Sequence, residues 1–334
     1  MIRRNNFDLL RLLMAVTVLL AHASELSLSP ALDWIWLDGS TLAVQGFFVI
    51  SGYLMMGSFG RSPSTLDFFR RRFLRIYPAY GAAVLLGSVA LVSMTNAARF
   101  GADWMHYLAA NLVFANWLHP GIAGVFEHNR LPAINGALWS MKFEVCCYLG
   151  VPVVFLLARR AGWIPVLCAI YASTAVAAGY VSSPLLHQLL GLVAGFVAGM
   201  ALHHWRVQFD RARWPLLAFA CVALAMRFAP AQPAAMAILV IAFARWTPHV
   251  DAAKFGDLSY GIYITHFPII QFLVAAGLFA SSPWLALAAA IVLPALAALL
   301  SWRFVESPFI RLAHTERAPG AERETLPAPE VKAS

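Results

Sequence analysis

Long apolar segments recur from one end of the sequence to the other, and they constrain the fold more than any other feature. A helix that crosses a bilayer needs about 20 mostly apolar residues. Ten segments approach this length, several of them bounded by Pro-containing turns: 7–26, 40–58, 77–95, 138–158, 164–181, 185–204, 214–229, 233–247, 258–279 and 283–304. Because 61% of the 334 residues are hydrophobic and only 12% are charged, too few polar side chains remain to coat a soluble domain. The sequence therefore predicts an all-α, polytopic membrane helix bundle.

Most basic residues lie in short clusters between these segments. If the N-terminus faces the cytoplasm, the clusters fall in cytoplasmic loops, as the positive-inside rule requires. This holds only if the apolar segment 104–118 does not span, so we expect it to be re-entrant or to lie at the outer interface, inside the external loop 96–137. The prediction is about ten transmembrane helices with both termini cytoplasmic. The same clustering argues against a nucleic-acid partner despite the formal net charge of +8.

The sequence indicates one domain and no internal repeat. Residues 1–312 form the predicted transmembrane domain, and the polar, Pro-rich residues 313–334 are expected to be a disordered cytoplasmic tail. All four cysteines lie inside apolar segments and read as small buried residues, so no disulfide framework is predicted. No metal-ligand spacing stands out either, and no metal is expected.

Charged side chains inside a predicted span are functional candidates, because each costs about 2.5–3.5 kcal/mol on insertion scales. Arg11 and His22 are about three helical turns apart in the first span and share one face. Glu144, in the fourth span, is expected at a depth similar to that of His22. An acid there could orient the imidazole and make it a better base. Structural alternatives stay open: a snorkelling arginine, an interfacial histidine, and a pair between Glu144 and either Lys142 or an arginine.

An arginine cluster precedes the third span at the predicted cytoplasmic surface: Arg70, Arg71, Arg72 and Arg75. Positive-inside anchoring alone would explain it. A phosphate-rich cofactor arriving from the cytoplasm would also need such a site, because arginine grips phosphate with a rigid fork of donors. Glu306, at the inner end of the last span, could pair with these arginines.

Further polar side chains within or beside the spans are expected to line a polar interior. They are Ser51, Trp139, Ser140, Tyr260, Tyr263, His266 and Glu306. Two structural alternatives remain open here. The small residues around Ser51 permit close helix contact, and His266 could bond a carbonyl freed by Pro268.

Six stretches, in this order, resemble the motifs of the acyltransferase 3 family of bacterial membrane acyltransferases, which modify surface polysaccharides and related acceptors. The first, FDLLRLLMAVTVLLAH, holds Arg11, ten residues and then His22. The second, GFFVISGYL, has Tyr53 where the family usually has Phe. The others are FFRRRFLRIYPAY, LWSMKFEVCCYL, YGIYITHFPI and FVESPF. The match runs through most of the chain.

The resemblance implies an O-acyltransferase of the bacterial cytoplasmic (inner) membrane. Its donor would be an acyl-CoA, usually acetyl-CoA, bound from the cytoplasm, and its acceptor a glycan or glycolipid approached from the other face. The resemblance implies that His22 is the catalytic histidine. It also implies that Arg11, Arg72 and Arg75 bind the donor or line the pore. Some relatives carry an extracytoplasmic hydrolase-like domain. This sequence ends soon after its last predicted span, so we expect it to complete the transfer alone or to pass its product to a separate protein on that side.

The mechanistic hypothesis is that His22, oriented by Glu144, removes the proton of the acceptor hydroxyl as the oxygen attacks the thioester. A relay through an acyl-histidine is the alternative chemistry. A proton-coupled transporter or flippase of a glycan or lipid-linked precursor is the rival function, because buried ionisable groups suit it equally. A non-catalytic partner subunit is a third. The acceptor stays open among O-antigen, exopolysaccharide, glucan, glycolipid and small secondary metabolite.

Overall fold

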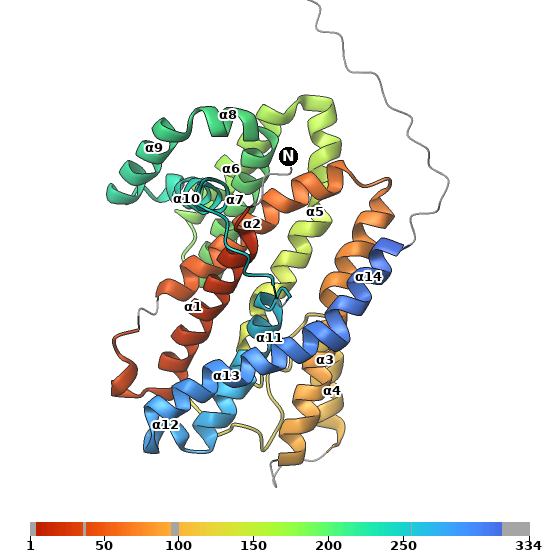
Figure 1. The fold of residues 1–334 in the computed structure, drawn as a ribbon, viewed down its shortest axis with the longest axis vertical. Helices are drawn as coiled ribbons and strands as arrows, with labels where there is room; N and C mark the ends of the chain where they lie inside the picture. Colours follow the sequence, from red (N-terminus) through yellow and green to blue (C-terminus); the bar gives the residue numbers. More distant parts are fainter. Residues whose placement is uncertain (1–4, 36–37, 95–99, 255, 316–334) are drawn as a thin grey trace, which may run out of the picture.

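The chain folds into a bundle of helices (Figure 1). The computed structural model describes residues 5–35, 38–94, 100–254 and 256–315, and these ranges contain no strand. The helices are α1 Phe7–Ser27, α2 Asp38–Gly60, α3 Thr65–Met94, α4 Ala102–Leu112, α5 Met141–Ala161, α6 Trp163–Ala178, α7 Pro184–His204, α8 Arg206–Arg211, α9 Arg213–Ala225, α10 Gln232–Trp246, α11 Ser259–Ala275, α12 Leu278–Ser281, α13 Pro283–Ser301 and α14 Ser307–Thr315. Short 3₁₀ turns (η1 Pro30–Leu32, η2 Gly136–Ser140, η3 Ala229–Ala231) and one π-helical turn (η4 Trp302–Glu306) complete the described elements. The predicted tail begins within α14, and its residues 316–334 lie outside the described ranges.

Each of the ten segments predicted from apolar length coincides with a helix. Among the described residues, seven helical segments are long and apolar enough to cross a membrane: Phe7–Ser27, Asp38–Gly60, Thr65–Met94, Gly136–Ala161, Pro184–His204, Ala229–Trp246 and Pro283–Ala313. The helices α6, α9 and α11 are apolar but shorter. The all-α membrane bundle is therefore confirmed, whereas the number of spans and the side of each terminus remain predictions.

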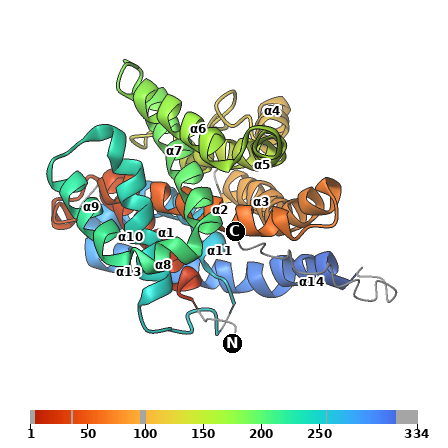
Figure 2. The same cartoon turned by 90° about the horizontal axis from the view of Figure 1, so that it is seen from above.

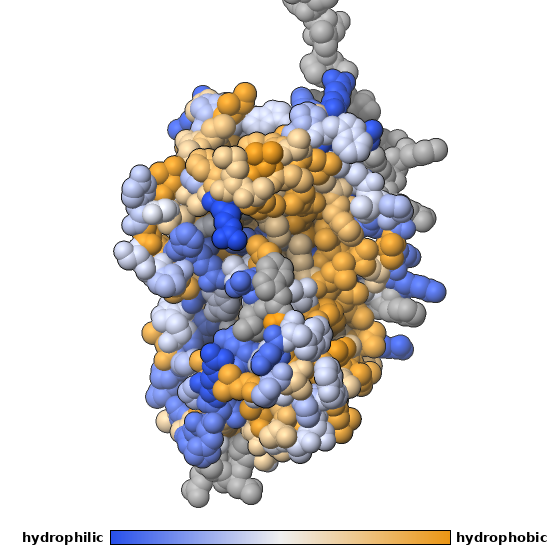
Figure 3. All heavy atoms as spheres, turned by 90° about the vertical axis from the view of Figure 1, so that its left-hand side faces the viewer, coloured by the Kyte–Doolittle hydropathy of each residue, from blue (hydrophilic) through white to orange (hydrophobic). Residues whose placement is uncertain are grey.

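Apolar side chains cover much of the outside of this bundle. Figure 3 shows a broad apolar area on one face, next to hydrophilic side chains. Leu86 on α3, Leu149 on α5 and Leu285 on α13 are 65%, 57% and 61% exposed. Helices satisfy their own backbone hydrogen bonds, so such a surface is suited to contact with lipid chains.

The segment 104–118 does not form a full-length span. Its helix α4 has 11 residues, about 16 Å at 1.5 Å per residue, which is shorter than the hydrocarbon core of a bilayer. It lies beside α3 (Figure 1), where Trp104 Nε1 donates to Ser88 Oγ over 3.1 Å. Tyr80 Oη also donates to the Asn111 carbonyl over 2.6 Å. The helix in this segment is thus shorter than a span, as we expected, while the topology itself stays a prediction.

Three helices, α1, α2 and α11, lie in the middle of the bundle (Figure 2). Among their neighbours, α2 packs closely along α7, with glycines where the two backbones approach. A Cβ added to Gly52 would overlap the backbone of Phe196, and a Cβ on Gly199 would overlap that of Val49. The glycine-containing stretch of the second predicted span therefore does permit close helix contact, as the sequence suggested.

The loop between α4 and α5 is fastened to α11. Pro268 has no N–H, so the Ile264 carbonyl one turn earlier lacks its usual helical donor. Asn135 Nδ2 from the loop donates to this carbonyl over 2.8 Å. Gln271, buried in α11, donates to the Ala133 carbonyl over 2.9 Å. These bonds hold the part of α11 that carries His266.

We expect Gly199→Leu to prevent correct folding, because its side chain has no space against the α2 backbone. Overpacking of this kind costs about 1–3 kcal/mol, and more where backbone must move. Gly191→Leu is the matched control on the same helix, since no heavy atom lies within 4 Å of the Cβ position of Gly191. The monodisperse fraction after detergent extraction, measured by size-exclusion chromatography, should fall only for Gly199→Leu. Equal recovery of the two variants would contradict the close α2–α7 contact.

Candidate functional site

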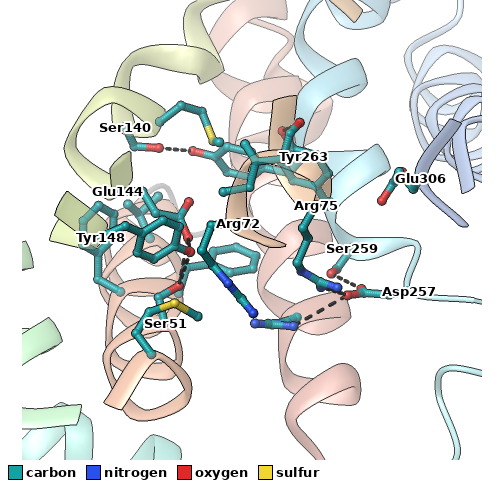
Figure 4. A pocket seen from close by; sticks show the side chains of 18 residues that line it. Ser51, Arg72, Arg75, Ser140, Glu144, Tyr148, Asp257, Ser259, Tyr263 and Glu306 are labelled. Atoms are coloured by element: carbon teal, nitrogen blue, oxygen red, sulfur yellow. Dashed lines mark hydrogen bonds and ion pairs between the residues drawn. The ribbon is translucent and has the colours of Figure 1, made fainter. Parts of the chain in front are cut away.

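A polar pocket lies inside the bundle, between α1, α2, α3, α5, α11 and the turn η4 (Figure 4). Its polar lining is Arg11, Ser51, Arg72, Arg75, Ser140, Glu144, Tyr148, Asp257, Ser259, Tyr260, Tyr263 and Glu306. Nine of these twelve were predicted from the sequence: Arg11, Ser51, Arg72, Arg75, Ser140, Glu144, Tyr260, Tyr263 and Glu306. Side chains far apart in the chain therefore converge in one interior pocket, as the cost of burying polar groups in a membrane demands.

This pocket continues into a wider cavity at the end of the bundle predicted to face the cytoplasm. The two cavities share four polar residues, Arg11, Arg72, Arg75 and Asp257. The wider one, called the mouth below, has a free volume of about 460 Å³ and is also lined by Arg61 and Arg71. The inner pocket is narrow, with about 80 Å³. A large anionic ligand would therefore fit at the mouth, with only a slender part reaching inward.

Asp257, in the loop just before α11, lies between two arginines where mouth and pocket meet. Its Oδ2 is 2.6 Å from Arg75 Nη2 and 3.6 Å from Arg11 Nη1. Ser259 Oγ donates to Oδ1 over 2.5 Å. Burial alone would raise the pKa of Asp257, but the charges of Arg11 and Arg75 and the hydrogen bonds lower its pKa below the usual value. Asp257 was not predicted; its one signal in the sequence is its place directly before the segment 258–279.

Arg72 and Arg71 differ in their partners, because a buried donor of Arg72 is left open whereas Arg71 is paired with a carboxylate. Arg72 Nη2 reaches Ser58 Oγ over 3.3 Å, whereas its buried Nε has no hydrogen-bond partner among the described residues. Figure 4 shows Arg72 and Arg75 reaching into the pocket. Arg71 instead pairs with Asp67 and donates to Ser62. A buried guanidinium with an open donor is the feature that an anionic ligand would satisfy.

Glu144 lines the pocket but does not orient His22, so that part of the hypothesis is wrong. Its Oε1 accepts a hydrogen bond from Ser51 Oγ over 2.9 Å and another from Tyr148 Oη. The alternative pair with Lys142 is not formed either, because Lys142 Nζ lies over the ring of Trp117, 4.3 Å from its centre. Glu144 therefore links α5 to α2 across the pocket wall.

The partner of His22 is His266. His22 Nδ1 lies 2.8 Å from His266 Nε2. His266 is fully buried in α11, and His22 is partly exposed on α1. Arg11 and His22 do share a face as predicted, because one reaches Asp257, just before α11, and the other reaches α11 itself.

Tyr263 separates the pocket from the histidine pair. It lines the pocket, and its ring centre is 6.0 Å from that of His266, one turn along α11. Its hydroxyl donates to the Ala137 carbonyl over 3.1 Å, and therefore accepts the 2.8 Å bond from Ser140 Oγ. The histidines are not among the residues lining the pocket, but they lie directly behind its wall.

Three more predicted residues remain to be described, and the first two, Trp139 and Glu306, differ from the expectation. Trp139 packs against the ring of Phe143, with 6.0 Å between centres, and does not line the pocket. Glu306 lines the pocket but accepts from Ser301 Oγ over 2.8 Å and is not among the ion pairs of the described residues. Tyr260 donates to the Ile76 carbonyl over 2.9 Å, which ties α11 to α3.

Comparison with known proteins identifies an acyl-transfer family. A family model described as "Acyltransferase domain" matches residues 4–303. Nodulation protein 10 of Rhizobium leguminosarum bv. viciae is 29% identical, over 92% of this chain and 94% of its own length. The O-acetyl transferase of Shigella phage Sf6 is 28% identical, over 92% and 96%. Acyltransferase MdmB of Streptomyces mycarofaciens is 27% identical over 49% of this chain and 40% of its own. No solved structure gives a significant match.

We expect Asp257→Asn to destabilise the protein at pH 7, because two arginines lose the carboxylate between them. Breaking a buried pair costs about 3–5 kcal/mol, and the 32% exposure of the Arg75 side chain places the effect at the lower end. The folded-state pKa of Asp257 is lowered, so its contribution is complete above the unfolded-state value of about 3.9 and is lost as the pH falls below it.

Melting curves of the purified protein from pH 7 to pH 3 test this. The difference in Tm between wild type and Asp257→Asn should be largest at pH 7 and shrink below about pH 4. Asp251→Asn, in the exposed part of the same loop, is the control and should melt like the wild type at pH 7. A Tm difference that stays constant down to pH 3 would show that the charge of Asp257 is not the cause.

Proposed function

The chain belongs to the acyltransferase 3 family and is a membrane O-acyltransferase, and we propose that it moves an acyl group from cytoplasmic acyl-CoA to a hydroxyl of a glycan or glycolipid. One observation carries the finer proposal. A cavity begins at an arginine-lined mouth, narrows inside the bundle, and ends at Tyr263, directly beside the paired histidines. The mouth suits an anionic donor, and the histidine pair suits a proton acceptor.

The donor site is the mouth. Acyl-CoA carries phosphates at one end and a thioester at the end of a slender arm, and the two cavities have this order of widths. The buried Nε of Arg72 lacks a partner among the described residues, and phosphate oxygens are suitable acceptors for it. Arg75 and Arg11 add positive charge, held in place by Asp257. Bound there, the donor would supply its acyl group at the inner end of the pocket, and the side chain of Tyr263 would have to move aside for this group to meet His22.

His22 is the proposed base. An imidazole that removes the acceptor's proton must be neutral and must offer one ring nitrogen to the hydroxyl. His22 is partly exposed, while its Nδ1 is occupied by His266. Its Nε2 would then accept the hydroxyl proton while the oxygen forms its bond to the acyl carbon, and would return the proton to the departing thiolate. Glu144 contributes by holding Ser51 and Tyr148 in the pocket wall.

The acceptor and the location are argued from the relatives. One relative is named an O-acetyl transferase, which supports acetyl as the group transferred. The family resemblance supports a hydroxyl of a surface polysaccharide or glycolipid, met from the extracytoplasmic face of the bacterial inner membrane. A separate protein on that face would receive the product if the chain does not complete the transfer alone. Transport without chemistry is not favoured, because the family and two of these relatives are named for acyl transfer.

We expect Arg72→Ala to weaken binding of acetyl-CoA about 10- to 100-fold, the equivalent of one or two charge-assisted hydrogen bonds. Binding is measured by calorimetry on protein in nanodiscs, so that no acceptor is needed. Arg160→Ala removes an exposed arginine at the end of α5 outside the mouth and should bind like the wild type. Equal weakening in both variants would indicate general charge attraction rather than a donor site at Arg72.

We expect His22→Ala to bind acetyl-CoA normally and to lose acyl transfer by about 10²–10⁴-fold, the usual contribution of a general base. Transfer is measured with labelled acetyl-CoA and membranes as the acceptor source, followed by mass spectrometry of cell-envelope glycans with and without the gene. If wild-type membranes incorporate no acyl group although the purified protein is folded, the acyl-CoA route is wrong and transport becomes the better function.

A further inference from the structure

We propose that His266 is a positioning residue that fixes the tautomer of His22. It keeps the proton of His22 on Nδ1 and leaves Nε2 as the bare nitrogen that accepts the acceptor's proton. The proposal rests on the function above, in which His22 is the base. It assigns His266 a task different from that of a pore-lining side chain.

The direction of two hydrogen bonds carries the argument. His266 Nδ1 lies 3.0 Å from the Ile262 carbonyl oxygen. A carbonyl only accepts, so His266 must carry a proton on Nδ1. A neutral imidazole has one N–H, which leaves His266 Nε2 as an acceptor. The 2.8 Å contact then requires His22 to donate from Nδ1, and a neutral His22 has its lone pair on Nε2.

The two rings lie edge to edge, in the plane that such a bond needs. Their centres are 5.1 Å apart and their planes differ by 11°. Each ring nitrogen lies close to its own ring centre. With 2.8 Å between the nitrogens, the two centres can be 5.1 Å apart only if both nitrogens lie on the line between them. Face-to-face stacking would bring the centres closer than this. The lone pair of His266 Nε2 therefore points along the N–H of His22.

The surroundings of His266 hold it neutral and immobile. It has no exposed surface, and it contacts the imidazole of His22, the Ile262 carbonyl and the ring of Tyr263, none of which is an anion. A buried cation without a paired anion is costly, so both imidazoles are neutral at rest. Asn135 fastens this part of α11 through the Ile264 carbonyl, and Phe267 packs edge-on against the ring of His22.

The proton balance of the transfer is then complete with one moving proton. The acceptor's O–H bond breaks and its proton joins His22 Nε2, while the oxygen bonds to the acyl carbon and the C–S bond breaks. The same proton passes from Nε2 to the thiolate, which leaves as a thiol. His266 keeps its own proton on Nδ1 throughout and accepts from the Nδ1–H of the transient His22 imidazolium, which it thereby stabilises.

The test compares two substitutions at His266 with a matched control. His266→Leu removes the acceptor of the Nδ1–H of His22, whereas His266→Gln offers an amide oxygen in its place. Thr265→Val is the control on the same helix. It also removes a side-chain bond to the preceding turn, from Thr265 Oγ1 to the Gly261 carbonyl over 2.7 Å, but it does not touch the histidine pair. Each variant is reconstituted in nanodiscs, and only folded protein is compared.

The first measurement needs no substrate. Nitrogen-15 NMR of histidine-labelled protein, with His22 signals assigned from their loss in His22→Ala, reports which nitrogen carries the proton. Wild type, Thr265→Val and His266→Gln should show His22 protonated on Nδ1, and His266→Leu should lose that state. A wild-type His22 protonated on Nε2 would overturn the proposal directly.

The second measurement is the rate of transfer. His266→Leu should lower kcat about 10²-fold, within the range of a base that is wrongly protonated, with an unchanged KM for acetyl-CoA. The kcat of His266→Gln should be about tenfold higher than that of His266→Leu. The kcat of Thr265→Val should match that of the wild type. Equal losses in the Leu and Gln variants, or a full rate in His266→Leu, would refute the role of His266. If the wild type transfers nothing, the failure belongs to the proposed function, and the NMR result decides the tautomer independently.

Discussion

The cost of a charge inside a membrane bundle determines how this molecule is assembled around its site. Arg11 on α1 and Arg75 on α3 both reach Asp257, at the start of α11. This carboxylate offsets much of the cost of turning both guanidinium groups toward the interior. One acidic side chain therefore brings three helices together and leaves Arg72, next to them, with an open donor. The proposed binding of an anionic donor at the mouth depends on that arrangement.

The sequence predicted the features that follow from lengths and distances along a helix axis. Apolar length placed all ten helical segments, and charge bias predicted that 104–118 does not span, where the structure has a helix of 11 residues. The small residues around Gly52 predicted the close α2–α7 contact. Helical periodicity put Arg11 and His22 on one face, and both do reach α11 or the residue before it. Nine of the twelve polar residues that line the pocket could be named in advance, because polar groups in spans must turn inward.

The features that the sequence did not predict depend on rotation about helix axes and on loops. Glu144 and His22 were paired because their depths agree, but depth says nothing of the direction in which α5 points its first turn. Packing turns Glu144 toward Ser51 on α2, and His22 meets His266 instead. Asp257 lies in a loop, where no periodicity marks a residue as buried. Its neighbour Ser259 was missed for a related reason, since a serine at a helix start is ordinary.

The separation of the arginine mouth from the histidine pair has a chemical consequence. Cations are needed where a phosphate-bearing ligand binds, yet a cation close to an imidazole opposes the positive charge that the imidazole gains when it accepts a proton. In this bundle the neutral Tyr263 stands between the two, held by Ser140 and the Ala137 carbonyl. His22 thus meets His266, a neutral acceptor, rather than an arginine. In the proposed function, the same polypeptide therefore attracts an anion at one end of its cavity and keeps a base available at the other.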